Sequence, residues 1–449
     1  MATSAHAGPA AERLAQSIRY ATISQQDRSQ IDYEAFRQHQ KFLRATYPKV
    51  FELLDVDVIA EHSLLLIWQG SDKGQAPVLF TAHTDVVPIE PGTEHDWPHP
   101  PFAGVIADGM IYGRGTLDDK VGVISLLEAI NNLLLQGYRP KRTLVFGFGH
   151  DEEISGRDGA GNIAKRLQEK GLHFDWMVDE GGFIASDNPL LPDRAVATIN
   201  VTEKVYITLT LRVKGPGGHS SMPPPHTSIG KLAAALVKIE SNPMPARLVS
   251  PVTDMLESLA PYMSFPKSFL FNNLWLTNSL LAYSMSKDRV TNAFVRSTTA
   301  VTMFNAGVKE NVVPQQAEAK VNFRPLPGET PLQLVNYINE IIEDPEIEIS
   351  YEDWANPPRV SSMEGGGYAV IEAAIKAVYT DAVVVPSMLF ATTDTRHYVG
   401  LVDNIYRFHG ALVQIEQASG AHGTNERIGV ESFENTVAIA EHMLRLGGE

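Results

Sequence analysis

Polar side chains with metal-binding chemistry follow several apolar runs in the first half of the chain. In "LFTAHTDVVP" the run ends in a histidine and an aspartate, His83 and Asp85. On an extended chain, residues two apart lie on the same face. His83 could therefore bind a metal with Asp85 as its orienting partner, or the pair could be an ordinary polar strand end. This stretch alone does not decide between the two interpretations.

The same pattern recurs in three more places. The stretches "GRGTLDDK", "FGHDEEISG" and "MVDEGG" each contain both glycine and a pair of adjacent acids. These acids are Asp118 and Asp119, Glu152 and Glu153, and Asp179 and Glu180. Successive groups are about one strand-plus-helix unit apart, roughly 30 residues. Ligands in α/β proteins sit beyond the carboxyl ends of the strands, so we expect these side chains at one edge of one sheet.

Such a concentration of carboxylates favours a metal centre. Like charges packed together are costly unless cations compensate them. The chain has no cysteine, so His, Asp and Glu must supply the ligands, as in catalytic zinc sites. The glycine-flanked "SGAHGTNERI" supplies a second histidine, His422. As an alternative, Glu152 and Glu153 could mark a solvated helix N-terminus. "GRGTLDDK" could also be a turn that caps the next helix, a role compatible with metal binding.

Composition limits the class of protein. The chain has 449 residues, enough for two domains, with 44% hydrophobic and 20% charged residues, as in globular proteins. Its net charge of −16 disfavours nucleic acid and anionic membranes as partners. No apolar run reaches the roughly 18 residues of a membrane span, and the first residues do not resemble a signal peptide. We therefore expect a cytoplasmic protein without a membrane partner.

Hydrophobic periodicity divides the chain into two parts. Residues 1–200 and 355–449 alternate buried strands with helices, which predicts a mainly parallel sheet sandwiched by helices in an α/β domain. Residues 201–354 have the order β-α-β-β-α-β of a ferredoxin-like α+β domain. Within this second part, the segment at about 243–292 is rich in Pro, Ser, Asn and aromatic residues, and we expect it to be an irregular insertion.

Taken together, the motifs resemble a known enzyme family. They are similar to the dinuclear zinc peptidases that include aminoacylases, glutamate carboxypeptidase, bacterial dipeptidases and Gly-Xaa carboxypeptidases. The stretches "HTDVVP", "GRGTLDDK", "GHDEEISG", "VDEGG", "GGHSS", "TDTRHY" and "HGTNERI" occur in the family's order and cover nearly the whole chain. "DEEISG", "VDEGG" and the bulky insertion most resemble the branch of carboxypeptidase S and the N-fatty-acyl amino acid hydrolases. The resemblance implies a zinc exopeptidase-like domain with a lid domain.

The resemblance also implies a ligand set for two divalent metal ions. Asp118 would bridge them. His83 and Asp179 would complete one site, and Glu153 and His422 would complete the other. The ions would be Zn²⁺, with Co²⁺ or Mn²⁺ as alternatives. A bridged pair of this kind can activate a water molecule and polarise a carbonyl.

Further roles follow from the resemblance. Asp85 would orient His83, and Glu152 would be the general base that passes a proton from water to the leaving amine. His219 in "GPGGHSS" would bind the oxyanion, often from a neighbouring subunit, which implies a homodimer through the lid. The same loop could hold phosphate, but it lacks the lysine and spacing of a P-loop. The implied substrate-binding residues are Arg324 as the carboxylate clamp, Asn311, Thr393, Asp394 and Arg396.

The expected activity is hydrolysis of an amide bond next to a free α-carboxylate, as in a carboxypeptidase or dipeptidase. The alternative is an N-acyl amino acid hydrolase of the aminoacylase type, with a fatty or aryl acyl group. The insertion at 243–292 could line an acyl pocket, or it could pack against the lid or a partner subunit. A catalytically silent relative is disfavoured, because neither the base Glu152 nor a ligand is missing.

Overall fold

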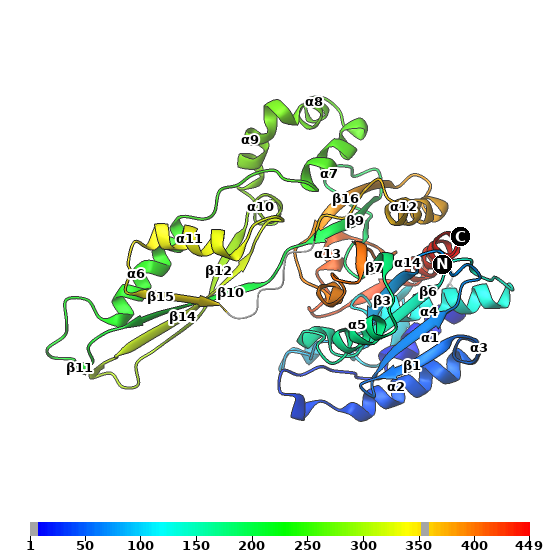
Figure 1. Ribbon diagram of the computed structural model, residues 1–449, viewed down its shortest axis with the longest axis horizontal. Helices are drawn as coiled ribbons and strands as arrows, with labels where there is room; N and C mark the ends of the chain where they lie inside the picture. Colours follow the sequence, from blue (N-terminus) through cyan, green and yellow to red (C-terminus); the bar gives the residue numbers. More distant parts are fainter. Residues whose placement is uncertain (1–7, 352–358) are drawn as a thin grey trace.

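The computed structural model describes residues 8–351 and 359–449 of the protein. Figure 1 shows a large α/β body that contains the first and the last described residues, and an elongated arm, green to yellow, that extends away from it. The expected boundary between residues 354 and 355 lies outside the described residues. Within the described ranges, no helix is both long and apolar enough to cross a membrane.

A ten-stranded mixed sheet organises the large body. Its strands, in spatial order, are β1 (Asp55–Ile59), β2 (Ser63–Trp68), β6 (Leu144–Gly149), β3 (Val78–His83), β7 (Phe174–Asp179), β17 (Val402–Arg407), β9 (Val196–Glu203), β8 (Ile184–Ala185) and β18 (Leu412–Val413), with β16 (Val383–Leu389) paired to β9. The central strands β6, β3, β7 and β17 are parallel. Their carboxyl ends therefore open at one edge, as the sequence predicts, while β1 and β2 add an antiparallel margin.

Helices cover both faces of this sheet. Leu64 and Leu66 of β2 join the core under one set of helices, whereas Leu65 and Ile67 join the core on the opposite face under α5. This alternation explains why "SLLLIW" is apolar at every position. The helices of the large body are α1 (Pro9–Ile18), α2 (Tyr33–Thr46), α3 (Pro48–Leu53), α4 (Lys120–Leu135), α5 (Ala160–Glu169), α12 (Gly366–Val378), α13 (Ile415–Ala418) and α14 (Val430–Gly447).

The arm is the expected ferredoxin-like lid. Its antiparallel sheet has the order β12 (Thr298–Ala306), β14 (Gln316–Arg324), β10 (Ile207–Lys214) and β15 (Ile347–Tyr351). The helices α6 (Ser228–Ser241) and α11 (Pro331–Ile342) pack on it through one apolar core. The large sheet continues through β9 to Glu203, three residues past the expected boundary at 200. Two small sheets complete the fold: β11 (Gly218–His219) with β13 (Val312–Val313), and β4 (Val105–Ala107) with β5 (Met110–Tyr112) and β19 (Arg427–Gly429).

The insertion differs from the expectation, because it is helical rather than irregular. It contains α7 (Val252–Leu259), α8 (Lys267–Asn272), α9 (Leu274–Met285) and α10 (Arg289–Val295). Pro251 and Pro266 directly precede α7 and α8, and Asp288 caps α10 by accepting from the amides of Val290 and Thr291. The residues that suggested irregular structure therefore divide the segment into short helices. These helices pack on β16 through a separate apolar core.

Candidate active site

The predicted polar side chains lie at the carboxyl edge of the central strands. His83 is the last residue of β3, and Glu152 and Glu153 begin a short 3-10 turn after β6. Asp118 precedes α4, whose N-cap is Asp119. His422 comes from a loop near the C-terminus, in the left-handed conformation with φ of 62°. Four segments that are distant in sequence therefore supply one cluster.

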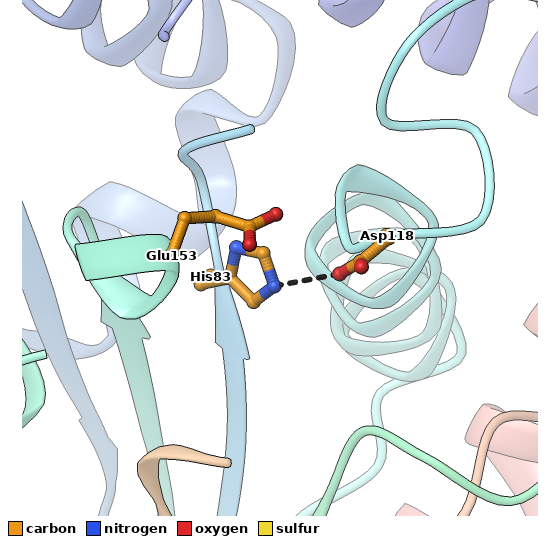
Figure 2. A group of neighbouring side chains, drawn as sticks. All are labelled: His83, Asp118 and Glu153. Atoms are coloured by element: carbon orange, nitrogen blue, oxygen red, sulfur yellow. Dashed lines mark hydrogen bonds and ion pairs between the residues drawn. The ribbon is translucent and has the colours of Figure 1, made fainter. Parts of the chain in front are cut away.

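Asp118 is the centre of this cluster. One of its carboxylate oxygens lies 2.9 Å from Nε2 of His83, and the other lies 2.9 Å from Nε2 of His422. Nε2 of His422 is also 3.2 Å from Glu153 Oε2. Figure 2 shows the side chains of His83, Asp118 and Glu153 converging from three elements. A carboxylate with a different histidine at each oxygen has the arrangement required to bridge two cations.

The donor set fits divalent metal ions. Two groups have all their candidate ligand atoms within 4.8 Å of one another: His83 with Asp118 and Glu153, and His83 with Glu152 and Glu180. Oε1 of Glu153 is buried and has no hydrogen-bond partner within the described residues. Imidazole and carboxylate donors with no thiolate suit a catalytic zinc-type centre. An unpartnered carboxylate oxygen aimed into such a cluster is what an absent cation would satisfy.

The electrostatics of the cluster support the same conclusion. Burial, together with neighbouring carboxylates, raises the pKa of Glu152 and of Glu180 well above the ordinary value. Burial and the charge of Asp118 raise the pKa of Glu153 to about 7. Hydrogen bonds that the His422 ring donates to Asp118 and Glu153 raise the pKa of His422 to about 10. Bound cations would stabilise the ionised forms of these three glutamates.

Asp85 lies beneath the cluster and is completely buried. Its carboxylate accepts hydrogen bonds from the amides of Glu152 and Glu153, both at 3.2 Å, and from the Ser24 hydroxyl at 2.6 Å. Nδ1 of His83 lies 3.0 Å from the backbone oxygen of Asp85 and 3.3 Å from its carboxylate. These acceptors favour a proton on Nδ1, which leaves Nε2 of His83 free to face Asp118. The geometry matches the orienting role expected for Asp85.

Glu180, the residue directly after β7, belongs to the cluster, whereas the expected ligand was Asp179. Glu180 Oε1 lies 3.5 Å from Nε2 of His83. The Asp179 carboxylate instead accepts from the Thr81 hydroxyl at 2.7 Å, and it belongs to neither group of candidate ligands. Asp179 is the last residue of β7 and Glu180 is the first residue beyond it, so the point at which the strand ends decides which side chain reaches the cluster.

Two expected residues lie far from the cluster. His219 is exposed on β11 and pairs with Val312 of β13. Asn311 lies beside it, with its backbone oxygen accepting from Ser220 N at 3.2 Å. Figure 1 places β11 at the end of the lid remote from β3 and β7. In this arrangement of the lid, the structure brings neither His219 nor Asn311 to the site.

The remaining expected residues lie at or near the rim of the site. Arg324 ends β14, and its guanidinium lies 3.4 Å from the hydroxyl of Thr392, one of the residues lining the cavity at the cluster. Thr393 is buried and lines the same cavity. Its amide donates a hydrogen bond to Glu203 at 3.2 Å, which fixes the backbone of the turn. Asp394 is buried, and its charge raises the pKa of Glu152. Arg396 follows in the same 3-10 turn, and its buried Nε has no partner within the described ranges.

Three further residues position the cluster although the sequence did not single them out for this role. Glu426 is fully buried, and its carboxylate accepts from the amides of Leu117 at 2.7 Å and Asp118 at 3.2 Å. Asp119 accepts from the amide of His83 at 3.2 Å, and Nε2 of His409 lies 2.7 Å from its other oxygen. Glu426 lies within the quoted "HGTNERI", so its place in that motif was the available signal. His409 follows β17 without any pattern that marks it.

A cavity of about 240 Å³ opens at the cluster. Its polar lining includes Asp118, Glu152, Glu180 and His422. Its apolar lining is formed by Phe183, Leu389, Ala411, Val413, Ala418 and Ala421. The cavity can therefore hold a group that has both polar and apolar parts.

Comparisons with known proteins agree with this geometry. Residues 79–446 match the family described as Peptidase family M20/M25/M40. "Probable carboxypeptidase S-like 2" of Dictyostelium discoideum is 37% identical over 97% of this chain and 84% of the relative. "N-fatty-acyl-amino acid synthase/hydrolase PM20D1" of Homo sapiens is 38% identical over 92% of this chain and 82% of the relative.

Solved structures share the fold. An M20 family metallo-carboxypeptidase, Sso-CP2 from Sulfolobus solfataricus, aligns with a TM-score of 0.68 and 19% identity, covering 98% of this chain and 99% of that one. Human carnosine dipeptidase 1 aligns with a TM-score of 0.63 and 15% identity, covering 98% and 96%. The match of the family to most of the chain, and of relatives over nearly all of it, establishes that the protein belongs to peptidase family M20/M25/M40.

Proposed function

We propose that the protein is a dimetal hydrolase that cleaves an amide bond adjacent to a free α-carboxylate, as a carboxypeptidase or dipeptidase does. The observation that carries this proposal is the position of Asp118 between His83 and His422, with Glu152 facing the same cavity. His83, Asp118, Glu153, Glu180 and His422 would hold two divalent ions, with Zn²⁺ as the expected metal. When bound there, the ions would supply Lewis-acid activation of water and of the amide carbonyl.

The residues of the chain have distinct tasks in this proposal. Glu152 lines the cavity and belongs to a candidate ligand group without being needed to bridge the ions. Its carboxylate would take a proton from the attacking water and return it to the leaving amine. Asp85 would keep Glu152 in place through its backbone amide, because the two are joined by a 3.2 Å hydrogen bond.

Arg324 is the proposed recognition group for the substrate carboxylate. Within the described ranges, no carboxylate forms an ion pair with its guanidinium, which lies 4.7 Å from the Tyr206 ring centroid. Burial lowers the pKa of Arg324, although the nearby Tyr206 and Glu203 partly oppose this shift. A substrate carboxylate would supply a direct counter-charge through paired hydrogen bonds. Thr393, Asp394 and Arg396 would form the neighbouring wall.

A second candidate function is hydrolysis of N-acyl amino acids. The apolar wall of Phe183, Leu389 and Val413 favours it, because an acyl chain would need such a surface on the far side of the scissile bond. The names of the relatives divide between the same two activities. Both candidates require the same metal centre and the same carboxylate clamp, and they differ in the acyl side of the substrate.

One experiment tests the proposal and separates the candidates. The purified protein is analysed for metal by mass spectrometry and assayed against a panel of dipeptides and N-acyl amino acids of increasing chain length. We expect about two divalent ions per chain. Chelation should abolish hydrolysis, and Zn²⁺, Co²⁺ or Mn²⁺ should restore it to different extents. Full activity without bound metal would contradict the proposal, and turnover of dipeptides alone would exclude the acyl alternative.

A further inference from the structure

The helical insertion exposes an unusual group of large apolar side chains. On α9, the exposed fractions are 82% for Trp275, 61% for Leu280 and 62% for Tyr283, while Leu274 and Leu281 pack inward. We call the exposed group the insertion patch; its members are Tyr262, Phe265, Phe269, Trp275, Leu276, Leu280, Tyr283 and Val290. Figure 1 shows α8 and α9 at the outer margin of the molecule, farther from the large sheet than α7. Large apolar side chains exposed together in one segment indicate an interaction site.

The charge of the patch differs from that of the rest of the chain. Residues 261–286 contain no aspartate or glutamate, although the chain as a whole has a net charge of −16. Basic residues lie at its margins: Lys267 begins α8, and Lys287 and Arg289 follow α9. Nζ of Lys287 lies 4.3 Å from the ring centroid of Tyr283. The acids of the insertion are Asp254 and Glu257 on α7 and Asp288, whose carboxylate caps α10. The stretch that carries most of the patch, residues 261–286, therefore combines exposed apolar side chains with a lysine and no acid.

We propose that the insertion patch binds the surface of a phospholipid layer. Tryptophan and tyrosine favour the boundary between headgroups and acyl chains, because each ring joins an apolar body to a polar atom. Leu276, Leu280 and Phe265 would lie among the acyl chains, and the marginal lysines would meet the phosphates. The net negative charge of the whole chain argued against a membrane partner, but the stretch 261–286 has a lysine and no acid, so its local charge is positive.

A second copy of the chain fits the patch less well. In a two-fold symmetric dimer, the same surface occurs on both sides of the interface. The margins of two insertion patches would bring Lys267, Lys287 and Arg289 against one another, with few acids to pair with them. A phospholipid surface offers phosphate to every one of these cations. Charge complementarity therefore selects the lipid.

The inner side of the insertion connects the patch to the active site. The ring of Phe294 on α10 packs on that of Phe390, with centroids 4.4 Å apart. Phe390 lies between Leu389 and Ala391, both of which line the cavity at the metal-binding cluster. A protein docked through the patch would thus hold its site near the surface where amphiphilic N-acyl amino acids accumulate. This consequence rests on the second candidate function, hydrolysis of N-acyl amino acids, whereas lipid binding itself does not.

Vesicle flotation tests the proposal. The full-length protein is mixed with vesicles of phosphatidylcholine, with and without phosphatidylglycerol. We expect binding that strengthens with the anionic lipid, and a loss of roughly tenfold or more in affinity for the triple variant Trp275→Ser, Leu276→Ser, Leu280→Ser. The matched control is Leu53→Ser with Leu135→Ser, which removes leucines 55% and 60% exposed on the large body. The control should bind as the unaltered protein does.

Additional measurements keep the outcome clear. Lys267→Gln with Lys287→Gln should weaken binding to the anionic vesicles more than to the neutral ones. Brominated lipid should quench tryptophan fluorescence in the unaltered protein and quench Trp275→Phe less. Circular dichroism, thermal unfolding and metal content establish that each variant folds. Flotation does not depend on catalysis, so its result stands whether or not the protein has the proposed hydrolase activity. No binding by the unaltered protein would overturn the proposal. A dimer that the triple variant dissociates, without any lipid binding, would assign the patch to a second copy.

Discussion

At the scale of single residues, the end of β7 shows how strand geometry selects a ligand. Glu180 and Asp179 are both buried or nearly buried acids, yet only Glu180 approaches His83, at 3.5 Å. The Asp179 carboxylate is held by the hydroxyl of Thr81. One of its oxygens, Oδ2, has no partner within the described residues. We therefore propose Glu180 as the ligand and Asp179 as a residue that supports the strand end.

The two neighbours make a matched pair for substitution. We predict that Glu180→Gln weakens binding of one metal ion by roughly 100-fold or more, because a direct ligand is lost, whereas Asp179→Asn costs at most about tenfold. Competition with a chelator of known affinity measures both. The reverse order, with the larger loss in Asp179→Asn, would return the ligand role to Asp179 as the resemblance implies.

Part of the site could be predicted from the sequence, because polar residues at strand ends leave a readable pattern. His83, Asp118, Glu153 and His422 do come together, as the spacing and the resemblance indicated. The choice between Asp179 and Glu180 depends on where β7 ends, which a single residue of register decides. His409 acts through one contact to Asp119, and a lone histidine after a strand gives no signal.

At the scale of elements, a buried ion pair holds the 3-10 turn Asp394–His397, beside the site, against the large sheet. Arg407 at the end of β17 donates to Glu203 at the end of β9, with Nε and Oε2 2.9 Å apart and both side chains essentially unexposed. Glu203 also accepts from the amide and hydroxyl of Thr393 and from the hydroxyl of Thr395. The turn that contains Asp394 and Arg396 is thereby fixed to two strands.

Breaking this pair should destabilise the large body. Glu203→Gln leaves the Arg407 guanidinium buried without its counter-charge, which typically costs about 3 to 5 kcal/mol of unfolding free energy. The double variant Glu203→Gln, Arg407→Met should recover part of that loss, because no unpaired charge remains. Urea denaturation followed by tryptophan fluorescence measures both. Equal stability of the single variant and the unaltered protein would show that the pair does not hold the fold.

Packing between α1 and α2 predicts a pH dependence of stability. His39 of α2 is fully buried, and its Nε2 lies 2.7 Å from the hydroxyl of Ser17 on α1. Burial and the nearby charge of Lys120 lower the pKa of His39 well below its ordinary value of 6.5. The unfolded chain therefore binds a proton near pH 6.5 that the folded chain does not, so unfolding becomes easier as the pH falls.

We predict that His39→Gln removes this contribution. Below pH 6.5, the unaltered protein should lose up to about 1.4 kcal/mol per pH unit relative to the variant, until the folded pKa is reached. Above that pH the difference between the two should be constant. Unfolding free energies measured from neutral to mildly acidic pH give the comparison. A difference that does not vary with pH would mean that His39 titrates alike in both states.

The elements themselves were predictable where periodicity was strong. The split order of the lid and the helix at 228–241 follow from alternating and helical patterns that their cores confirm. The insertion was not predictable in this way, because Pro251, Pro266 and Asn273 interrupt it every few residues. Those residues stand at helix starts rather than inside helices. The backbone structure is needed to distinguish these two positions.

At the scale of the whole molecule, the distance between the lid tip and the large body raises a question about His219. If His219 binds the oxyanion, either the lid closes or a second chain supplies the residue. The lid has a strand edge available for pairing, because β12 ends its sheet and leaves Met303 and Phe304 exposed by 49% and 41%. Edge strands with exposed apolar residues commonly pair with another chain. We therefore expect His219 to act across a dimer.

Mixing two inactive variants distinguishes the two routes. Glu152→Gln should lower kcat by roughly 10²- to 10⁴-fold while keeping fold and metal, and His219→Ala should also be strongly impaired. If His219 acts across subunits, each mixed dimer contains one site with both groups intact. Random exchange makes about half of the dimers mixed, so the mixture should regain about a quarter of normal activity. If His219 acts within its own chain, every site in the mixed dimer lacks one group. No recovery, once native mass spectrometry shows that subunits have exchanged, would therefore assign catalysis to closure of the lid within one chain.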